Sequence, residues 1–128
     1  MSLTQSEADY LMALEKQFET DDPLILGDTP LDFSRFLISL DGRERFIVDV
    51  WRGTLSLRKY KLQERTRVVI PLVRVDVGGA PHINPDGVRV PCPHIHLYRE
   101  GYDDKWAFPL QDYSFSDPGD VVVVFQDF

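Results

Sequence analysis

From residue 31 to residue 50 the sequence reads Leu31-Asp-Phe-Ser-Arg-Phe-Leu-Ile-Ser-Leu-Asp-Gly-Arg-Glu-Arg-Phe-Ile-Val-Asp-Val50. The first ten of these residues fit a period of two, which places alternate side chains on opposite faces of a strand. Asp41-Gly42 follows, and this dipeptide is the strongest short signal for a two-residue hairpin turn. Phe46-Ile-Val-Asp-Val50 then supplies a second strand. These residues predict an antiparallel β-hairpin.

More strands are predicted after this hairpin. Arg52-Gly53 is a weaker turn signal, and the segments 54–62 and 67–77 are rich in residues that favour strands. Pro71 cannot donate to a strand ladder, so it marks an edge, a bulge or a break. Strands joined by tight turns predict an antiparallel meander of about five or six strands within about 31–128.

A helix is predicted before the hairpin. Thr4-Gln5-Ser6-Glu7 has the form of a capping box, in which the threonine hydroxyl and the glutamate each accept from a backbone amide. Apolar residues follow at helical spacing and predict an amphipathic helix over about 6–19, which Pro23 ends. This helix packed on the sheet gives an α+β fold, with 1–128 as a single domain.

The end of the chain gives two conflicting signals. Ser116-Asp-Pro-Gly-Asp120 resembles a helix start, with a proline in the first turn and acidic residues near the amino end. Val121-Val-Val-Val-Phe125 is a β-branched run, which favours a strand. On propensity we expect the strand.

Composition limits the class of protein. A chain of 128 residues, 43% of them hydrophobic, can bury one real core without disulfide or metal support. Cys92 is the single cysteine, and no positively charged start leads into an apolar run. The sequence therefore predicts a cytoplasmic protein with no membrane segment.

The charge is distributed unevenly along the chain. The formal net charge of −7 argues against a protein that coats nucleic acid non-specifically, because lysines and arginines drive such binding. The segment 52–67, here called the basic ribbon, is the exception. Its one acidic residue is Glu64, and its six basic residues are Arg52, Arg58, Lys59, Lys61, Arg65 and Arg67. Such a ribbon fits either a surface for an anionic ligand or a solvated sheet face.

All three histidines lie within fifteen consecutive residues, at His82, His94 and His96. The segment 78–93 holds turn-forming glycines and an Asn-Pro-Asp-Gly run, and prolines near its end predict a rigid loop between strands. Beyond it, alternation in a strand places Ile95 and Leu97 on one face. His94, His96 and Tyr98 then share an outer surface or cleft, toward which His82 can fold back.

This arrangement permits two kinds of chemistry. The rings can converge on zinc or another divalent metal, with His82 or Cys92 completing a ligand set of His82, His94, His96 and Cys92. Alternatively, the rings can flank a scissile phosphate as general base and general acid. In that case Tyr98 and Arg74 assist, and a substrate is bound by Asn84 and by the basic ribbon through Arg58, Lys59, Lys61, Arg65 and Arg67.

Other interpretations are structural. Histidines in proline-rich loops often bond to backbone carbonyls, and Tyr98 can serve only to anchor a strand. Cys92 is either a small buried residue or a nucleophile activated by His94. Four aspartates can orient imidazoles or bind metal, although Asp86 fits a turn and Asp103-Asp104 a loop; they are Asp76, Asp86, Asp103 and Asp104.

The run Pro93-His-Ile-His-Leu-Tyr-Arg-Glu-Gly-Tyr-Asp-Asp-Lys-Trp-Ala107 resembles that of a family of short bacterial and phage proteins with a domain of unknown function. More remotely, the chain is similar to the TumE-like toxins of toxin-antitoxin systems. Those toxins carry an Asp-Asn-Ala-Pro-His segment followed by a Pro-His-His-x-His run. Here the corresponding segments are Asp76-Val-Gly-Gly-Ala-Pro-His82 and Pro93-His-Ile-His96, with one histidine fewer and an insertion at 84–89.

The leading hypothesis is a toxin-like or defence-associated cytoplasmic protein that acts on RNA. His82, His94 and His96 then transfer protons while the basic ribbon holds phosphates, and a cognate antitoxin-like protein is a further partner. A second hypothesis is a non-catalytic binding or partner protein in which the histidines are structural. A third is a hydrolase that depends on a divalent metal.

Overall fold

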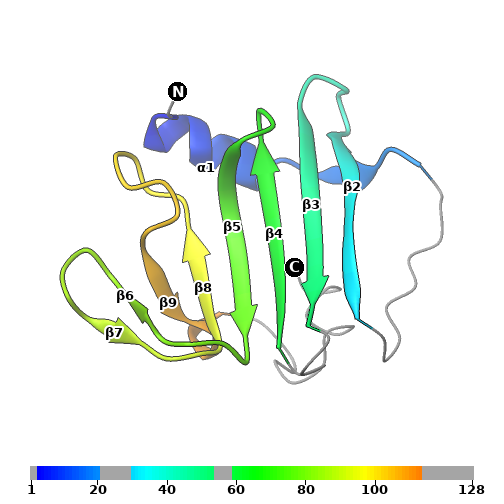
Figure 1. Ribbon diagram of the computed structural model, residues 1–128. Helices are drawn as coiled ribbons and strands as arrows, with labels where there is room; N and C mark the ends of the chain where they lie inside the picture. The colour runs from blue at the N-terminus through cyan, green and yellow to red at the C-terminus, as the bar shows by residue number, and fades with distance from the viewer. Residues whose placement is uncertain (1–2, 21–29, 54–58, 114–128) are drawn as a thin grey trace.

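The computed structural model describes residues 3–20, 30–53 and 59–113 (Figure 1). The chain forms one α-helix, nine strands and a short 3₁₀-helix within those residues: α1 (Gln5–Ala13), β1 (Lys16–Phe18), β2 (Leu31–Ser39), β3 (Arg45–Arg52), β4 (Tyr60–Thr66), β5 (Ile70–Val77), β6 (His82–Ile83), β7 (Arg89–Val90), β8 (His94–Leu97), β9 (Ala107–Pro109) and η1 (Leu110–Asp112).

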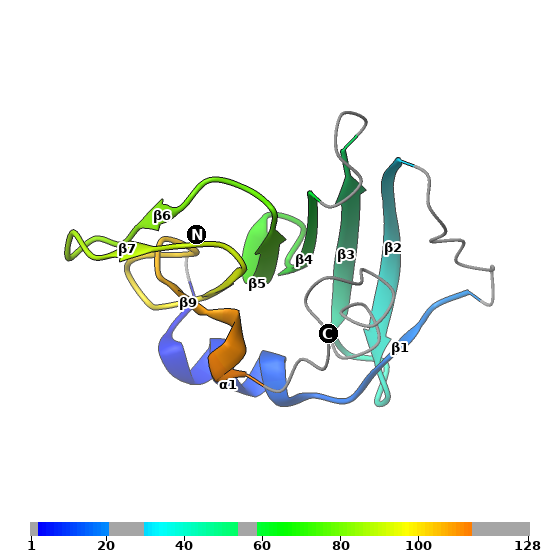
Figure 2. The ribbon, with the colours of Figure 1, turned by 90° about the horizontal axis from the view of Figure 1, so that it is seen from below.

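Seven strands form one sheet in the order β1-β2-β3-β4-β5-β8-β9, and every neighbouring pair is antiparallel. The strands β6 and β7 pair only with each other and form a hairpin between β5 and β8, here called the arm. Figure 2 shows the arm beside β9, extending away from the other strands. The antiparallel α+β architecture is confirmed, although the sheet holds more strands than the five or six predicted.

The hairpin of β2 and β3 lies where the sequence predicted it, with Phe33 opposite Val50 and Leu37 opposite Phe46. In its turn, Asp41 Oδ1 accepts hydrogen bonds from the Ser39 hydroxyl at 2.6 Å and from the Arg43 amide at 3.0 Å. Gly42 has a φ of 75°, a conformation that glycine adopts without steric cost.

The helix starts as predicted but ends early. Thr4 Oγ1 accepts from the Glu7 amide and Glu7 Oε1 accepts from the Thr4 amide, both at 3.1 Å, which confirms the capping box. The predicted end near residue 19 is wrong, because the backbone is extended at Leu14 and residues 16–18 form β1. Lys16 Nζ donates to the carbonyls of Met12 and Leu14, and the backbone then gains ladder bonds with β2.

The strands predicted at 54–62 and 67–77 also have different limits. Residues 54–58 lie outside the described residues, and β4 continues to Thr66. The turn then occupies 67–69, where Arg67 and Val68 have φ values of 49° and 70°. The charged residues at the end of β4 argued against a strand there, but the structure pairs them with opposite charges. Glu64 lies 3.4 Å from Lys16, and Arg65 lies 2.8 Å from Asp49.

Pro71 lies in β5, which is flanked by β4 and β8 and is therefore not an edge strand. It is paired with Arg65 at a shift in register between Glu64 and Arg65. Of the three predicted roles, the bulge is the one that applies, since a bulge tolerates a missing amide donor.

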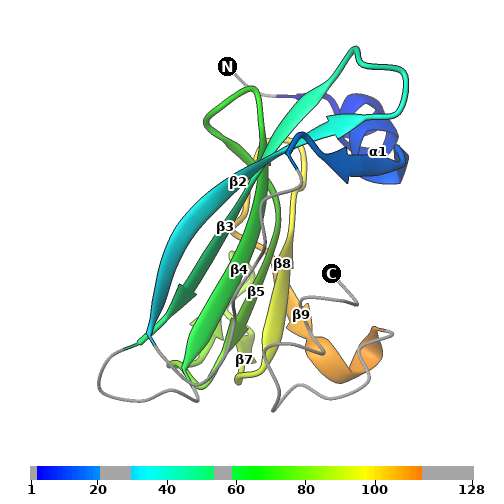
Figure 3. The ribbon, with the colours of Figure 1, turned by 90° about the vertical axis from the view of Figure 1, so that its right-hand side faces the viewer.

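Apolar side chains gather on one face of the sheet, here called the core face. The helix covers one end of this face (Figure 3), where Ala8 and Leu11 pack with Phe46, Leu72 and Tyr98. A second cluster occupies the rest of the face and comprises Leu31, Val48, Val50, Tyr60, Leu62, Val75, Val77, Ile95 and Leu110. Ile95 thus enters the core with Leu97, which shares its face, packed against the same cluster, and His94 and His96 must point the other way.

Two predictions concern residues outside the described part of the chain, namely most of the irregular segment at 24–30 and the strand at 121–125. Among the described residues, no helix has the length and hydrophobicity needed to cross a membrane.

Candidate functional site

The register of the sheet determines which side chains are neighbours at the site. On the face opposite the core, here called the outer face, paired residues form two rows that cross four strands from β3 to β8. The first row is Trp51, Lys61, Asp76 and His94, and the second is Asp49, Gln63, Arg74 and His96. Directly paired residues of antiparallel strands project to the same side, so these polar groups are neighbours.

The three histidines come together as predicted. The ring centroid of His82 lies 4.6 Å from that of His96, and those of His94 and His96 are 4.9 Å apart. Their predicted exposure is wrong, because His94 and His96 are each only 1% exposed. The arm holds His82 over them: His82 Nε2 donates to the Lys105 carbonyl at 2.7 Å, and Asn84 binds Ala107 next to it.

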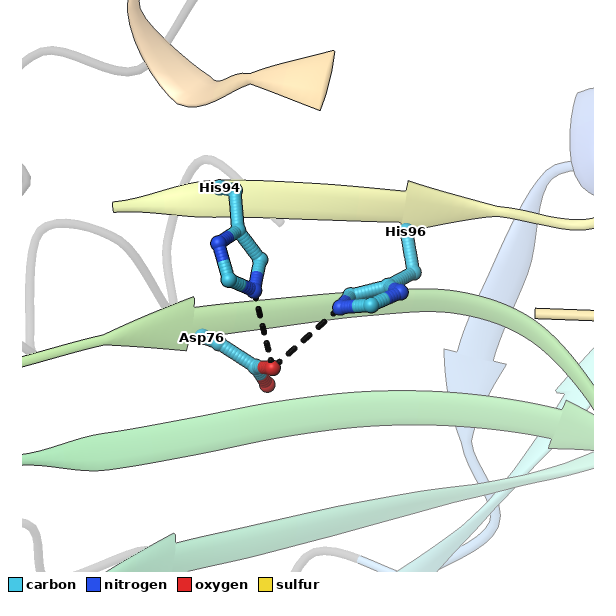
Figure 4. A group of neighbouring side chains, drawn as sticks. All are labelled: Asp76, His94 and His96. Atoms are coloured by element: carbon cyan, nitrogen blue, oxygen red, sulfur yellow. Dashed lines mark hydrogen bonds and ion pairs between the residues drawn. The ribbon is translucent and has the colours of Figure 1, made fainter. Parts of the chain in front are cut away.

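Asp76 links the two buried imidazoles. Its Oδ2 atom lies 3.2 Å from His94 Nε2 and 3.3 Å from His96 Nε2, and both rings extend from β8 toward it (Figure 4). Burial alone would raise the pKa of this carboxyl group. The hydrogen bond to His96 and the charge of Arg74 outweigh burial, so the pKa lies far below its usual range and Asp76 is ionised at neutral pH.

Arg74 surrounds the same groups with a fixed positive charge. Its Nε and one terminal nitrogen donate to the two oxygens of Asp76 at 3.1 and 3.2 Å. That terminal nitrogen also lies 3.0 Å from His96 Nε2, and the other donates to the Asp104 carboxylate at 3.1 Å. The structure thus places Arg74 beside His96 and Asp76.

The partners of His96 define its protons. Its Nδ1 lies 2.8 Å from the Asp104 carbonyl, which can only accept, so Nδ1 carries a proton. Its Nε2 lies 3.0 Å from an Arg74 nitrogen, which can only donate, and 3.3 Å from Asp76 Oδ2, which can only accept. A donor and an acceptor are therefore both in place for Nε2.

His94 lies between Asp76 and Cys92. Its Nε2 donates to the ionised Asp76, so the other nitrogen, Nδ1, faces the Cys92 sulfur at 3.5 Å. Burial and the neighbouring His96 lower the pKa of His94, although Asp76 and the Pro91 carbonyl favour its charged form. Burial raises the pKa of the Cys92 thiol. At neutral pH the pair is thus a neutral imidazole beside a protonated thiol.

A possible metal-binding set differs from the predicted one. The donor atoms that converge within 4.8 Å of one another belong to Asp76, His94 and His96. Cys92 faces Nδ1 of His94, whereas the other donors face Nε2, so the thiol is directed away from the point where these atoms meet. His82 Nε2 is engaged by a backbone carbonyl.

Two predicted site residues have structural partners instead. Tyr98 follows β8 and turns to the core face, where its hydroxyl donates to the Leu3 carbonyl at 2.6 Å and accepts from the Leu3 amide at 2.8 Å. Asn84 is 7% exposed, and its side-chain amide binds both backbone groups of Ala107. Asp86 serves the turn of the arm, as expected, by accepting from the Val88 amide.

The basic ribbon does not form one surface in the described residues. Arg52 is buried, Arg65 pairs with Asp49, and Arg67 lies 3.5 Å from Glu7. Arg58 lies outside the described residues. Lys59 and Lys61 reach the site, because they line a pocket of about 200 Å³ together with Asp76, Val77, Gly79, Ala80 and Cys92.

Two aspartates, Asp76 and Asp104, contribute more to the site than the sequence indicates. Asp76 was one of four candidates to orient an imidazole, and its central position depends on the pairing of β5 with β8 across a long intervening segment. The resemblance to the toxins was the available signal, since it sets Asp76 at the head of the first motif segment. Asp104 acts through its carbonyl as well as its carboxylate, and a carbonyl leaves no signal in the sequence.

Comparison with known proteins gives one match. No curated protein and no solved structure matches this chain. Residues 3–128 match a family of unknown function, DUF6978, and this match includes every residue of the site. The chain therefore belongs to the DUF6978 family.

Proposed function

We propose that this protein acts on RNA as a toxin-like or defence-associated enzyme, with His94 and His96 as its proton-transfer groups. The observation that carries the proposal is the position of Arg74, which contacts the Asp76 carboxylate and His96 Nε2 at the same time. A fixed cation beside two imidazoles suits a reaction in which protons move while negative charge develops on a phosphate.

The chemistry uses the 2′-hydroxyl group of RNA. One imidazole takes the proton of this hydroxyl, whose oxygen attacks the adjacent phosphorus. The bond from phosphorus to the 5′-oxygen breaks, and the other imidazole returns a proton to that oxygen. The low pKa of His94 keeps it neutral and suits the base, whereas Asp76 can hold a charged His96, which suits the acid.

The pocket beside Asp76 supports access of a phosphate to these buried groups. Lys59 and Lys61 line it, and both side chains are exposed to solvent. Two ammonium groups at the opening attract a polyanion, although the net charge of the whole chain is −7. His82 is less buried than the other two histidines and borders them from the arm.

The test compares the wild type with His94→Gln and His96→Gln for growth inhibition, RNA integrity and thermal melting. Glutamine retains hydrogen bonding but transfers no proton, so cleavage should fall about 10²- to 10⁴-fold. Arg45→Gln is the matched control, because Arg45 pairs with Glu19 on an exposed part of β3. Folded histidine variants that cleave at the wild-type rate would contradict the proposal.

The resemblance to toxin-antitoxin systems implies a cognate antitoxin-like protein, whose co-expression should restore growth. The rival function is a non-catalytic binding protein. In that case the wild type causes no RNA cleavage, and the histidine variants change only the melting temperature.

A metal-dependent hydrolase is the second candidate, supported by the three converging donors. Separations of 3.2 and 3.3 Å between the Asp76 oxygen and the two Nε2 atoms suit ligands placed about 2.1 Å from one ion. The bond from His96 Nδ1 to a carbonyl is also common behind a metal ligand. Arg74 argues against this function, since its cation already contacts two of the three donors.

Elemental analysis of protein purified without an affinity tag separates these two functions. Near-stoichiometric zinc or another divalent ion, lost in Asp76→Asn, would favour the hydrolase. Under the acid and base mechanism we expect only traces of metal and RNA cleavage that persists in a chelator.

A further inference from the structure

The first row of the outer face contains an aromatic side chain in line with the site. Trp51 of β3 is paired with Lys61 of β4, Lys61 with Asp76 of β5, and Asp76 with His94 of β8. Adjacent strands are about 4.8 Å apart, so the backbone of Trp51 lies about 10 Å from that of Asp76. An indole, an ammonium group, a carboxylate and an imidazole therefore follow one another across the sheet.

Trp51 is not part of the core. It is 36% exposed and belongs to neither cluster of apolar side chains on the core face. The other tryptophan, Trp106, is half-buried and has close neighbours around its ring. Its ring packs 4.6 Å from the Arg99 guanidinium and edge-to-face against Tyr102 at 5.8 Å, and its indole nitrogen is buried.

Charges around Trp51 favour one direction for a bound polyanion. Asp32, which is exposed, is paired with Trp51 on the side away from the site, and its carboxylate repels phosphate. Lys61 is paired with Trp51 on the side toward the site. The pocket lined by Lys61 and Asp76 then continues the same path.

We infer that Trp51 stacks against a base of single-stranded RNA and places the next phosphates at Lys61 and Lys59, which line the pocket beside Asp76. The inference rests on the proposed function and names its substrate class. Stacking on an aromatic ring tolerates any base but needs an unstacked face, which a single strand offers and a duplex does not. The distance of about 10 Å allows the stacked base and the reacting phosphate to belong to neighbouring nucleotides.

The chain holds two tryptophans, so fluorescence can report on Trp51 alone. In Trp106→Phe, Trp51 is the remaining indole. Titration with a short 2′-O-methyl oligouridine, which lacks the attacking hydroxyl, should quench its emission. The same strand annealed to its complement should not. Quenching by the duplex to the same extent, or by neither form, would overturn the inference.

Affinity gives the second measurement. Trp51→Leu should weaken binding of the same oligouridine about 5- to 150-fold, whereas Trp51→Phe should retain most of the affinity. Phe36→Leu is the matched control, because Phe36 is an exposed aromatic residue of the outer face that lies outside the row. Equal losses in Trp51→Leu and Phe36→Leu, or no loss in either, would overturn the inference.

The two proposals can fail separately. Binding that depends on Trp51 without cleavage of unmodified RNA would support this inference and contradict the proposed function. Cleavage at the wild-type rate by a folded Trp51→Leu protein, with unchanged affinity, would support the proposed function and contradict this inference.

Discussion

Asp76 sets the protonation of the site because one of its oxygens is shared by two imidazoles. Its ionised carboxylate orients His94 through Nε2, so the lone pair of Nδ1 points away from it. The same oxygen lies 3.3 Å from His96 Nε2. Arg74 compensates the negative charge of the Asp76 carboxylate. In this largely buried position, an unpaired carboxylate would cost several kcal/mol.

The low pKa of His94 predicts how stability depends on pH. The unfolded chain binds a proton at this histidine near pH 6.5, whereas the folded protein binds it only at lower pH. Stability should therefore fall as the pH drops below about 6.5, with a slope of at most about 1.4 kcal/mol per pH unit from this group. The pKa of Asp76 is also lowered, and the stability that this group contributes is lost only below about pH 4.

Urea unfolding at several pH values between about 7.5 and 5 tests this prediction. His94→Gln should reduce the loss of stability on acidification, while Arg45→Gln should keep the wild-type dependence. Parallel curves for the wild type and His94→Gln would show that the histidine does not charge on unfolding.

The residue types in the sequence indicated which chemical groups form the site, but they did not indicate how deeply these groups are buried. Three histidines in a short segment predicted a cluster, and the rings do meet. The alternation after His94 correctly separated the histidines from Ile95 but did not show that they are covered. Their burial depends on the arm and on the segment around Lys105, which tertiary contacts bring over them.

The arm is the element that covers the histidines. Asn84, which begins the turn of the arm, makes two hydrogen bonds to Ala107 at 3.0 and 2.8 Å, and His82 bonds to Lys105. Ile83 and Val88 of the arm are exposed, with 67% and 56% accessible. A short two-stranded element held by few contacts opens by breaking few of them, so its opening should cost less than global unfolding.

Removing the contact between Asn84 and Ala107 should loosen the arm. Asn84→Ala breaks two buried hydrogen bonds and should destabilise the arm by about 2 kcal/mol. Hydrogen exchange at the Ala107 amide should then be faster. Asp86→Ala is the control, because Asp86 bonds to Val88 within the exposed turn and should leave that amide protected. Equal protection of Ala107 in both variants would mean that Asn84 does not hold the arm.

Elements with strong local signals were predictable and those set by pairing were not. Asp41-Gly42 located the first hairpin, and the capping box located the start of α1. The end of α1 depended on the edge of β2, which captures residues 16–18 as a strand. The arm has two strands of two residues each, too short for a periodic pattern to reveal.

Among the described residues, the fold pairs some basic side chains with acidic ones and places others beside the pocket. The basic ribbon predicted five cations for phosphate, but Arg65 and Arg67 have acidic partners. Lys59 and Lys61 remain beside the pocket. The sequence could show the excess of positive charge, but only the register of β3 with β4 and the position of α1 show which cations are compensated.

This distribution predicts a shallow salt dependence for RNA binding. Two lysines that neutralise about two phosphates of a single strand give a slope of about −1.4 for log K against log salt, rather than about −3.5 for five cations. Measurements across a salt series should give the shallow slope. The double variant Lys59→Gln/Lys61→Gln should flatten it further, whereas Arg65→Gln should not. A slope near −3.5 would mean that the paired arginines also contact phosphate.

The bonds between Leu3 and Tyr98 join positions separated by 95 residues. During synthesis on a ribosome, Leu3 is made before its binding partner Tyr98, which emerges only after His94 and His96. The helix α1 must therefore wait, with Leu11 lacking the part of its packing surface that Leu72 and Tyr98 provide. Docking of Leu3 therefore follows synthesis of both buried histidines, so a nascent chain that stalls before Tyr98 lacks this contact.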